Sequence, residues 1–187
     1  MPKNTALLLK LWLQNPRKIG AIVPSSPNLA KAMAKCLPES GTGYVVELGG
    51  GTGPVTRALL EGGLEPERLI VIERDKHLHN LLSGQYPQIK ILQGDAIHLK
   101  KLLHQHGIDK VSAIVSSLPL LAMSKQIRHR IGDECFSVLS PGAPLIQFTY
   151  GFLPPLRKHN CNIVAMKEKS ILRNIPPATV WTYRQSS

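Results

Sequence analysis

Short apolar runs and amphipathic segments alternate along most of the chain. The apolar runs predict seven β-strands, near residues 44–48, 69–73, 89–92, 112–116, 144–149, 162–168 and 178–183. Apolar positions at helical spacing predict helices near residues 28–37, 53–62, 75–83, 96–105 and 124–137. Because this alternation is typical of a mainly parallel sheet with helices on both faces, we expect an α/β fold built on a seven-stranded sheet.

The first residues show a different pattern, a predicted helix over residues 4–14 that is apolar around most of its circumference. Its leucines and Trp12 form a wide apolar face. Its narrow polar edge consists of Lys3, Lys10, Gln14 and Arg17. Such a helix either lies in a membrane interface, with its basic edge toward anionic headgroups, or packs on the core of the domain. We therefore divide the chain into an N-terminal amphipathic, membrane-associating helix, residues 1–18, and one domain, residues 19–187.

A glycine cluster follows the first predicted strand, in the sequence Y-V-V-E-L-G-G-G-T-G-P-V-T (44–56). The glycines at 49, 51 and 53 have the spacing G-x-G-x-G, which lets the backbone bend sharply and approach a ligand. Pro54 stands where a dinucleotide fingerprint needs glycine, and the G-K-[ST] ending of a phosphate-binding loop is absent. An acidic residue in the strand, here Glu47, followed by G-x-G-x-G is typical of the nucleoside-binding turn of class I S-adenosylmethionine (SAM) methyltransferases. The alternative is a glycine-rich turn without a ligand.

Two acidic residues follow the next two predicted strands. Glu73 stands 20 residues after Gly53, about where a carboxylate that accepts hydrogen bonds from both ribose hydroxyls should fall. The alternative is a solvated charge at a strand end. Asp95, in Gly94-Asp95-Ala96, is placed to accept a bond from an adenine amino group, or only to cap the following helix. Three such signals in the right order together favour a nucleoside-containing cofactor.

Composition narrows the class of partner. The 187 residues fit one domain, and the net charge of +11 indicates an anionic partner, either nucleic acid or an acidic membrane surface. The scattered cysteines and the closely spaced histidine pairs do not form a ligand pattern, so we expect no metal site. No apolar run reaches the roughly 18 to 20 residues that a membrane span needs.

The assembled motifs resemble the small bacterial phospholipid N-methyltransferases, which are class I SAM-dependent enzymes that methylate phosphatidylethanolamine toward phosphatidylcholine. Relatives of these enzymes act on ornithine lipids. The resemblance rests on I-G-A-I-V-P-S-S (19–26), V-E-L-G-G-G-T-G-P-V-T (46–56), I-E-R (72–74), G-D-A (94–96), I-V-S-S-L-P-L-L (114–121), I-Q-F-T-Y-G (146–151) and N-I-P-P-A-T-V-W (174–181). The chain departs from the family pattern at Gly50, where we expect proline, and at Ser117, where we expect glycine.

The resemblance implies a Rossmann-like class I methyltransferase fold, SAM as cofactor and a set of site residues. The expected cofactor-binding residues are Ser25, Ser26, Glu47, Gly49, Gly51, Thr52, Gly53, Glu73, Arg74, Asp95, Ala96 and Ser116. Ser25 and Ser26 have an alternative role as caps of the predicted helix 28–37. The residues expected to orient the acceptor amine are Ser116, Ser117 and Tyr150, and their alternative role is to satisfy nearby backbone groups. No dedicated general base is required, because burial in a pocket lowers the pKa of the acceptor ammonium.

The resemblance also implies where the protein acts and on what. The acceptor is phosphatidylethanolamine, at an anionic phospholipid surface on the cytoplasmic face of the inner membrane. The cations expected to hold its phosphodiester are Arg157, Lys158 or Arg173. We expect neither a nucleic acid nor an obligate protein partner.

The main alternative is an rRNA adenine N6-methyltransferase, because that family shares the fold and the general layout. It resembles N-L-P-Y at the end of the fourth strand, where the Asn holds the target amino group and the Tyr stacks on a flipped base. This chain has Ser117-Leu118-Pro119-Leu120 there, so the amide and the aromatic ring are both missing. Aromatic residues make up only 5% of the chain, which is little for base stacking, so the sequence favours a lipid acceptor.

Overall fold

The structure is a computed structural model, and it describes residues 26–39, 41–150, 152–156, 162–172 and 177–186. The predicted helix over residues 4–14 lies outside the described residues, as does Ser25. The cations expected to hold a phosphodiester, Arg157, Lys158 and Arg173, lie outside them too. The division of the chain at residue 18 therefore stays a prediction.

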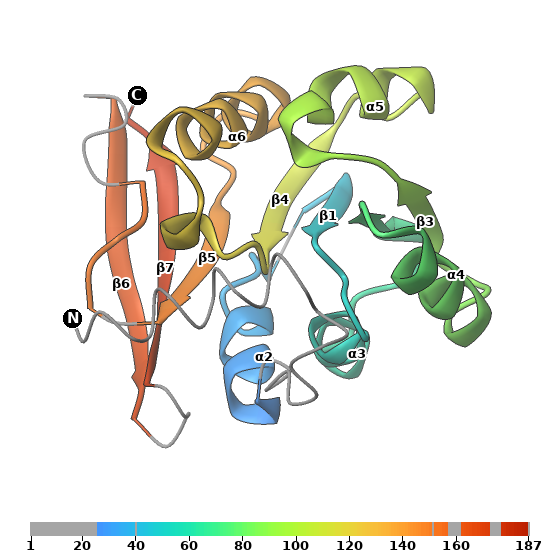
Figure 1. Ribbon diagram of the computed structural model, residues 1–187, viewed down its shortest axis with the longest axis horizontal. Coiled ribbons are helices and arrows are strands. Elements are labelled where there is room, and N and C mark those ends of the chain that lie inside the picture. The colour runs from blue at the N-terminus through green and yellow to red at the C-terminus, as the bar shows by residue number, and fades with distance from the viewer. Residues whose placement is uncertain (1–25, 40, 151, 157–161, 173–176, 187) are drawn as a thin grey trace.

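Within the described residues, seven strands form one mixed sheet, as the sequence predicts (Figure 1). The strands are β1 (Tyr44–Leu48), β2 (Leu69–Glu73), β3 (Lys90–Gln93), β4 (Val111–Ser116), β5 (Leu145–Tyr150), β6 (Ile163–Ile171) and β7 (Ala178–Gln185). Their order is β3-β2-β1-β4-β5-β7-β6, and the strands from β1 to β5 pair in parallel. β7 is antiparallel to both of its neighbours, so among the strands that the structure describes it alone runs against the others. This is the mainly parallel sheet expected of a Rossmann-like methyltransferase fold.

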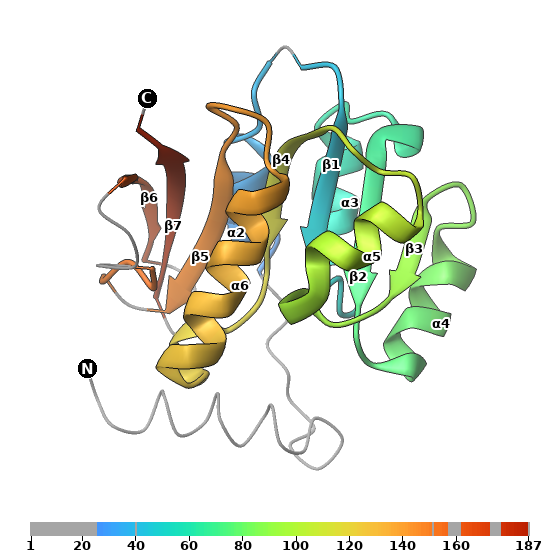
Figure 2. The ribbon, with the colours of Figure 1, turned by 90° about the horizontal axis from the view of Figure 1, so that it is seen from above.

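Helices cover both faces of the sheet, with α5 and α6 on one side and α2 and α3 on the other (Figure 2). The helices are α2 (Pro27–Ala34), α3 (Pro54–Glu61), α4 (Lys76–Gln85), α5 (Leu99–Gln105) and α6 (Lys125–Val138), with 3₁₀ turns η1 (Pro66–Arg68), η2 (Ala96–His98) and η3 (Leu120–Ala122). Strand side chains alternate between two cores: Val45 and Val71 pack toward α2 and α3, whereas Val46 and Ile70 pack toward α5. None of the described helices has the length and apolar character needed to cross a bilayer.

Side-chain caps set where several helices begin. The amide of Leu29 donates to Oγ of Ser26 at 3.3 Å, and the amide of His77 donates to Oδ1 of Asp75 at 2.8 Å. These contacts satisfy backbone donors that a helix start leaves unpaired. Ser26 therefore acts as a helix cap, which is the alternative role that the sequence left open for it.

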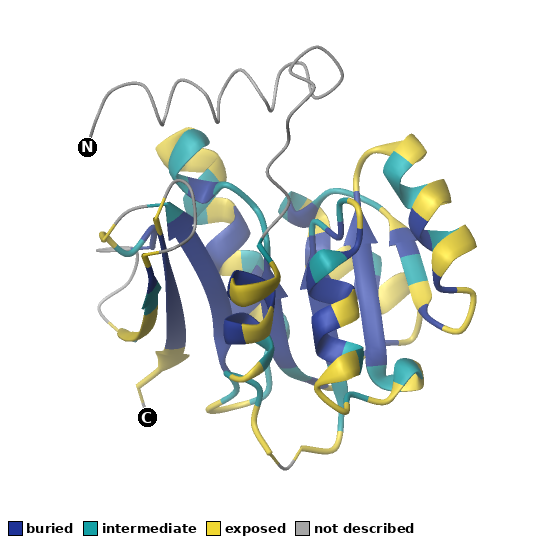
Figure 3. Cartoon of the chain, turned by 90° about the horizontal axis from the view of Figure 1, so that it is seen from below, coloured by how far each residue is buried: buried dark blue, intermediate teal, exposed yellow. Residues whose placement is uncertain are grey.

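Burial follows this layered arrangement, with the inner strands buried and the outward helix faces exposed (Figure 3). Because β1 to β5 are parallel, their carboxyl ends share one edge of the sheet. That edge carries the glycine turn after β1, Glu73 at the end of β2, Asp95 after β3, Ser117 after β4 and Tyr150 at the end of β5. Ligands in open α/β sheets bind beyond this kind of edge.

Candidate functional site

The turn between β1 and α3 has the backbone of a ligand cradle. Gly49, Gly51 and Gly53 have φ values of 77°, 58° and 89°, which L side chains rarely adopt. A Cβ at Gly49 would lie 2.9 Å from Cδ2 of Leu118, and one at Gly53 would lie 3.0 Å from the ring of Tyr86. Among the described residues, no atom lies within 4 Å of a Cβ built at Gly51. A side chain at either outer glycine would press on Leu118 or Tyr86, whereas the middle glycine has room beside it among the described residues, where a ligand can approach the backbone.

Glu73 joins this turn to the start of α4. It is largely buried, and its Oε2 accepts from the amide of Gly51 at 3.0 Å while its Oε1 accepts from the amide of Asp75 at 2.9 Å. Glu73 is therefore a positioned carboxylate and not a solvated strand-end charge. Because each carboxylate oxygen can accept more than one hydrogen bond, both oxygens can also accept from the two hydroxyls of a ribose.

Glu47 lies fully buried at the end of β1. Its Oε2 accepts from Oγ1 of Thr56 at 2.7 Å, and its Oε1 is buried with no partner among the described residues. Burial raises the pKa of Glu47 to about 7, the charge of Glu73 adds to this rise, and the hydrogen bonds from Thr56 oppose it. A buried oxygen without a donor suits a ligand that brings a cationic N–H group.

Asp95 takes the capping role that the sequence left open, and its contact with an adenine amino group stays a prediction. Its Oδ1 accepts from the amide of Ile97 at 3.1 Å, so Asp95 caps η2, and Ala96 is buried beside it. Its Oδ2 lies 3.4 Å from Nη1 of Arg74, whose side chain is 71% exposed. Since this exposed ion pair is weak, Arg74 can move aside for a ligand on Oδ2.

The residues expected to orient the acceptor differ in how their polar groups are used. Oγ of Ser116 accepts from the amide of Leu118 at 3.4 Å, whereas Oγ of Ser117 is buried without a partner in the described part of the chain. Tyr150 packs on the α2 side of the sheet, edge-on to Phe148 with ring centroids 5.2 Å apart, and burial raises the pKa of its hydroxyl. Ser117 is therefore the one of the three whose side-chain oxygen is both buried and unpaired.

Two polar residues were not singled out by the sequence analysis, although both occur in the motifs quoted there. Thr56 holds Glu47, and Gln147 is fully buried in β5, where its Nε2 donates to the carbonyl of Leu118 at 2.9 Å. A polar residue inside an otherwise apolar strand, as Gln147 is in L-I-Q-F, was the available signal.

The residues at this edge fit SAM. The backbone at Gly51 is open to contact by the cofactor. The anchored carboxylate of Glu73 can accept from the ribose, and the unpaired oxygen of Glu47 can accept from a cationic group. Thr52 completes the same turn between Gly51 and Gly53.

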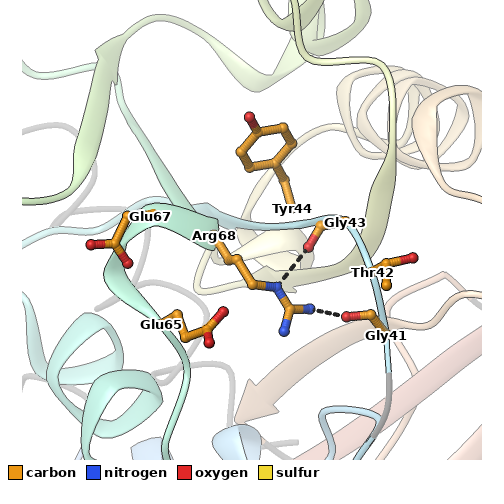
Figure 4. Close-up of a pocket in the computed structure, with 7 residues that line it drawn as sticks. All are labelled: Gly41, Thr42, Gly43, Tyr44, Glu65, Glu67 and Arg68. Atoms are coloured by element: carbon orange, nitrogen blue, oxygen red, sulfur yellow. Dashed lines mark hydrogen bonds between the residues drawn. The ribbon is translucent and has the colours of Figure 1, made fainter.

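A separate pocket of about 410 Å³ lies at the opposite edge of the sheet, before β1 and β2 (Figure 4). There the guanidinium of Arg68 points at the loop before β1. It donates to the carbonyl of Gly43 at 3.1 Å and also to the carbonyl of Gly41. These bonds close the loop onto η1 and use donors that a ligand would need. Because parallel strands place this pocket at their amino ends, it is remote from the glycine turn, and we assign the cofactor to the turn.

Comparisons with known proteins show the fold and the family of this chain. A scan against models of protein families finds no match. The ornithine lipid N-methyltransferase of Singulisphaera acidiphila is 30% identical over 150 residues, which cover 79% of this chain and 78% of that relative. The ribosomal RNA small subunit methyltransferase A of Chlorobium chlorochromatii is 36% identical over 86 residues, which cover 46% of this chain and only 31% of that relative.

A solved structure with the same fold is the O-methyltransferase of Bacillus cereus in complex with SAH. It superposes with a TM-score of 0.70 at 13% identity, covering 99% of this chain and 93% of that one. Identity this low shows the fold alone, whereas the match to the lipid enzyme extends over most of both chains. The chain therefore belongs to the family of the Singulisphaera ornithine lipid N-methyltransferase, and it is a class I SAM-dependent methyltransferase.

Proposed function

We propose that the protein transfers a methyl group from SAM to the primary amine of a membrane amino-lipid, with phosphatidylethanolamine as the acceptor that we predict. The observation that carries this proposal is the extent of the match to the lipid N-methyltransferase, 79% of this chain against 46% for the Chlorobium rRNA enzyme. The loop after β4 supports it, because Ser117-Leu118-Pro119-Leu120 offers no aromatic platform for a flipped base.

Each part of the site has a task in this reaction. Bound SAM supplies an electrophilic methyl group. Glu73, the Gly51 turn and Glu47 bind and orient the cofactor at the carboxyl edge. Ser117 and the strand end at Tyr150 border the acceptor, and the buried surroundings favour the neutral amine over the ammonium. The amine nitrogen forms a new N–C bond as the C–S bond breaks, the bonding pair stays on sulfur, and the amine proton leaves to solvent.

Positioning is the main contribution of the protein. Holding two reactants in line contributes on the order of 7 to 11 kcal/mol in the best oriented cases. Leu118 links the two halves of the site, because its side chain packs on Gly49 and its carbonyl accepts from Gln147. A general base is not needed once the amine is neutral.

Apolar side chains beside the site support action at a lipid surface. Phe152 and Leu153, just after β5, are 61% and 52% exposed, and Leu172, just after β6, is 70% exposed. These segments are close in space, because Tyr150 and Ile171 both pair with Ala178 of β7. Exposed apolar side chains gathered at one edge are typical of a contact surface.

The N-terminal segment and the net charge complete the proposal. With a charge of +11, the protein favours anionic headgroups, and we propose a peripheral location on the cytoplasmic face of the inner membrane. Deleting residues 1–15 should weaken binding to liposomes, most clearly to those with anionic lipid. If the truncated protein floats with liposomes as well as the full chain does, the N-terminal helix has no role in membrane binding.

The decisive experiment is methyl transfer from labelled SAM to phosphatidylethanolamine liposomes, ornithine-lipid liposomes and ribosomal RNA in parallel. We expect label in lipid, and mono-, di- and trimethylated headgroups would give the number of transfers. Glu73→Ala should abolish transfer, while the matched carboxylate variant Glu67→Gln, exposed at the opposite edge of the sheet, should not. Label that enters RNA and not lipid would overturn the proposal in favour of the rRNA alternative.

A further inference from the structure

Unpaired polar atoms gather beside the acceptor loop. Among the described residues, the buried side-chain nitrogen and oxygen atoms without a hydrogen-bond partner belong to Glu47, Ser117, Arg128, Gln147 and Trp181. Glu47 belongs to the cofactor turn, and the others come from the loop after β4, from α6, from β5 and from β7. Buried unpaired polar atoms are rare in native proteins because each costs free energy, so several in one region indicate a missing partner.

The fold brings Arg128, Gln147 and Trp181 to the same side of the sheet, whereas Glu47 faces α3 on the other side. Gln147 of β5 and Trp181 of β7 are direct partners across the antiparallel ladder, so their side chains lie next to each other. Trp181 belongs to the core that packs against α6. Arg128 lies one helical turn before Ile131 and Gly132, which face this core, so it points the same way. The charge of Arg128 also acts on Tyr183, two residues from Trp181 on the same face of β7.

The amide of Gln147 is fixed in one orientation. Its Nε2 donates to the carbonyls of Leu118, at 2.9 Å, and Phe148, at 2.6 Å, so both amide hydrogens are used. Its Oε1 remains as an acceptor that has no donor in the described part of the chain. Because Leu118 follows Ser117 and packs on Gly49, this cluster is tied to the loop that borders the cofactor turn.

The unpaired groups define the chemistry of the missing partner. The indole N–H of Trp181 can only donate, the guanidinium N–H of Arg128 donates and carries positive charge, and the hydroxyl of Ser117 can do either. Such a set suits an anionic oxygen group, for which charge-assisted hydrogen bonds are strongest. Oε1 of Gln147 can accept a hydrogen bond from an N–H or O–H group next to that anion.

We propose that Ser117, Arg128, Gln147 and Trp181 form a subsite that binds the anionic group of the acceptor, a phosphate or a carboxylate. This inference rests on the proposed function, since it assumes that the amine reacts at the neighbouring cofactor turn. Gln147 is 0% exposed and Trp181 8% exposed, so they form the floor, and the half-buried Ser117 and Arg128 form the entrance. The subsite lies within the described residues and is distinct from the expected cations near the chain end.

A binding measurement can test the subsite without turnover. The chain has two tryptophans, so in a Trp12→Phe background the intrinsic fluorescence reports on Trp181 alone. We expect O-phosphoethanolamine and N2-acetylornithine to change this fluorescence saturably, and ethanolamine, which lacks the anion, to have no effect. Inorganic phosphate should compete with O-phosphoethanolamine. An equal response to ethanolamine would overturn the proposal.

Variants separate the subsite from the rest of the site. Arg128→Gln should weaken probe binding and raise the KM for lipid by about tenfold or more, as expected for a lost charge-assisted contact. Trp181→Phe removes the N–H group together with part of the ring system, and it should raise the KM for lipid in the same direction. Lys125→Gln, a cation change in the same turn of α6, should have little effect. SAM affinity should be unchanged in all of them.

The outcomes keep the two proposals apart. If wild-type protein methylates lipid while Arg128→Gln and Trp181→Phe leave KM and probe binding unchanged, ordered water fills the cluster and the subsite is refuted. If SAM binds but no lipid is methylated, and the probes still titrate in an Arg128-dependent way, the anion site stands and the proposed lipid reaction fails. Loss of folding in either variant would show as altered thermal unfolding, and Arg128→Lys then repeats the KM test with the charge kept.

Discussion

The buried carboxyl of Glu47 gives a quantitative prediction for stability against pH. Its pKa rises from the usual 4.5 to about 7 on folding, chiefly through burial. Between these values the folded state holds a proton that the unfolded state has released. Stability therefore falls as pH rises from about 4.5 to 7 and then levels off, and at 1.36 kcal/mol per pKa unit the loss is roughly 3 kcal/mol.

Glu47→Gln removes this titration and keeps a side-chain oxygen for Thr56, whose hydroxyl donates at 2.7 Å in the wild type. We expect the free energy of unfolding of the variant, relative to wild type, to be higher at pH 8 than at pH 5 by up to about 3 kcal/mol. Urea unfolding of both proteins without SAM, at both pH values, measures this difference. A difference that is the same at both pH values would refute the reasoning, because Glu47 would then ionise as it does in water.

Three further predictions follow from the same edge of the sheet. Glu73→Ala should weaken SAM binding at least tenfold in calorimetry, since it removes the ribose acceptor and the anchor of Gly51; unchanged affinity would remove Glu73 from the site. Gly51→Ala should lower the free energy of unfolding by about 1 to 2 kcal/mol, because of its positive φ, and should also reduce SAM affinity. Gly49→Ala should destabilise the fold further, because its Cβ would clash with Leu118. Equal losses of stability in thermal unfolding would contradict this distinction. Phe152→Ser with Leu172→Ser should lower partitioning onto anionic liposomes by tenfold or more, as each buried apolar side chain contributes about 1.5 to 3 kcal/mol, and flotation at wild-type level would show that this edge faces water.

Strand positions were predictable because both sheet faces are covered, which leaves apolar runs that are easily recognised. The predicted run 89–92 became β3 at Lys90–Gln93, a shift of one residue. The predicted helix 96–105 divides into η2, which the side chain of Asp95 caps, and α5. Helical periodicity does not report a local hydrogen bond of this kind.

Tertiary contacts account for what the sequence could not predict. The position of β7 between β5 and β6 depends on long-range pairing, and only that pairing sets Trp181 beside Gln147. The burial of Glu47 depends on the packing of α3 over β1, which brings Thr56 within hydrogen-bond distance. The glycine turn and Glu73 were recognisable because their chemistry depends on residue type and spacing within one βαβ unit.

The antiparallel insertion of β7 also bears on how this enzyme can change in evolution. Tyr150, Ile171 and Ala178 meet in register, so the connection after β5 starts at the same edge of the sheet where the connection between β6 and β7 both starts and finishes. Among the described strands, β1 to β4, with the turn, Glu73 and Asp95, are joined to this part of the sheet only through the pairing of β4 with β5. Insertions and exchanges after residue 150 can therefore remodel what the enzyme accepts while the half that holds the methyl donor stays intact.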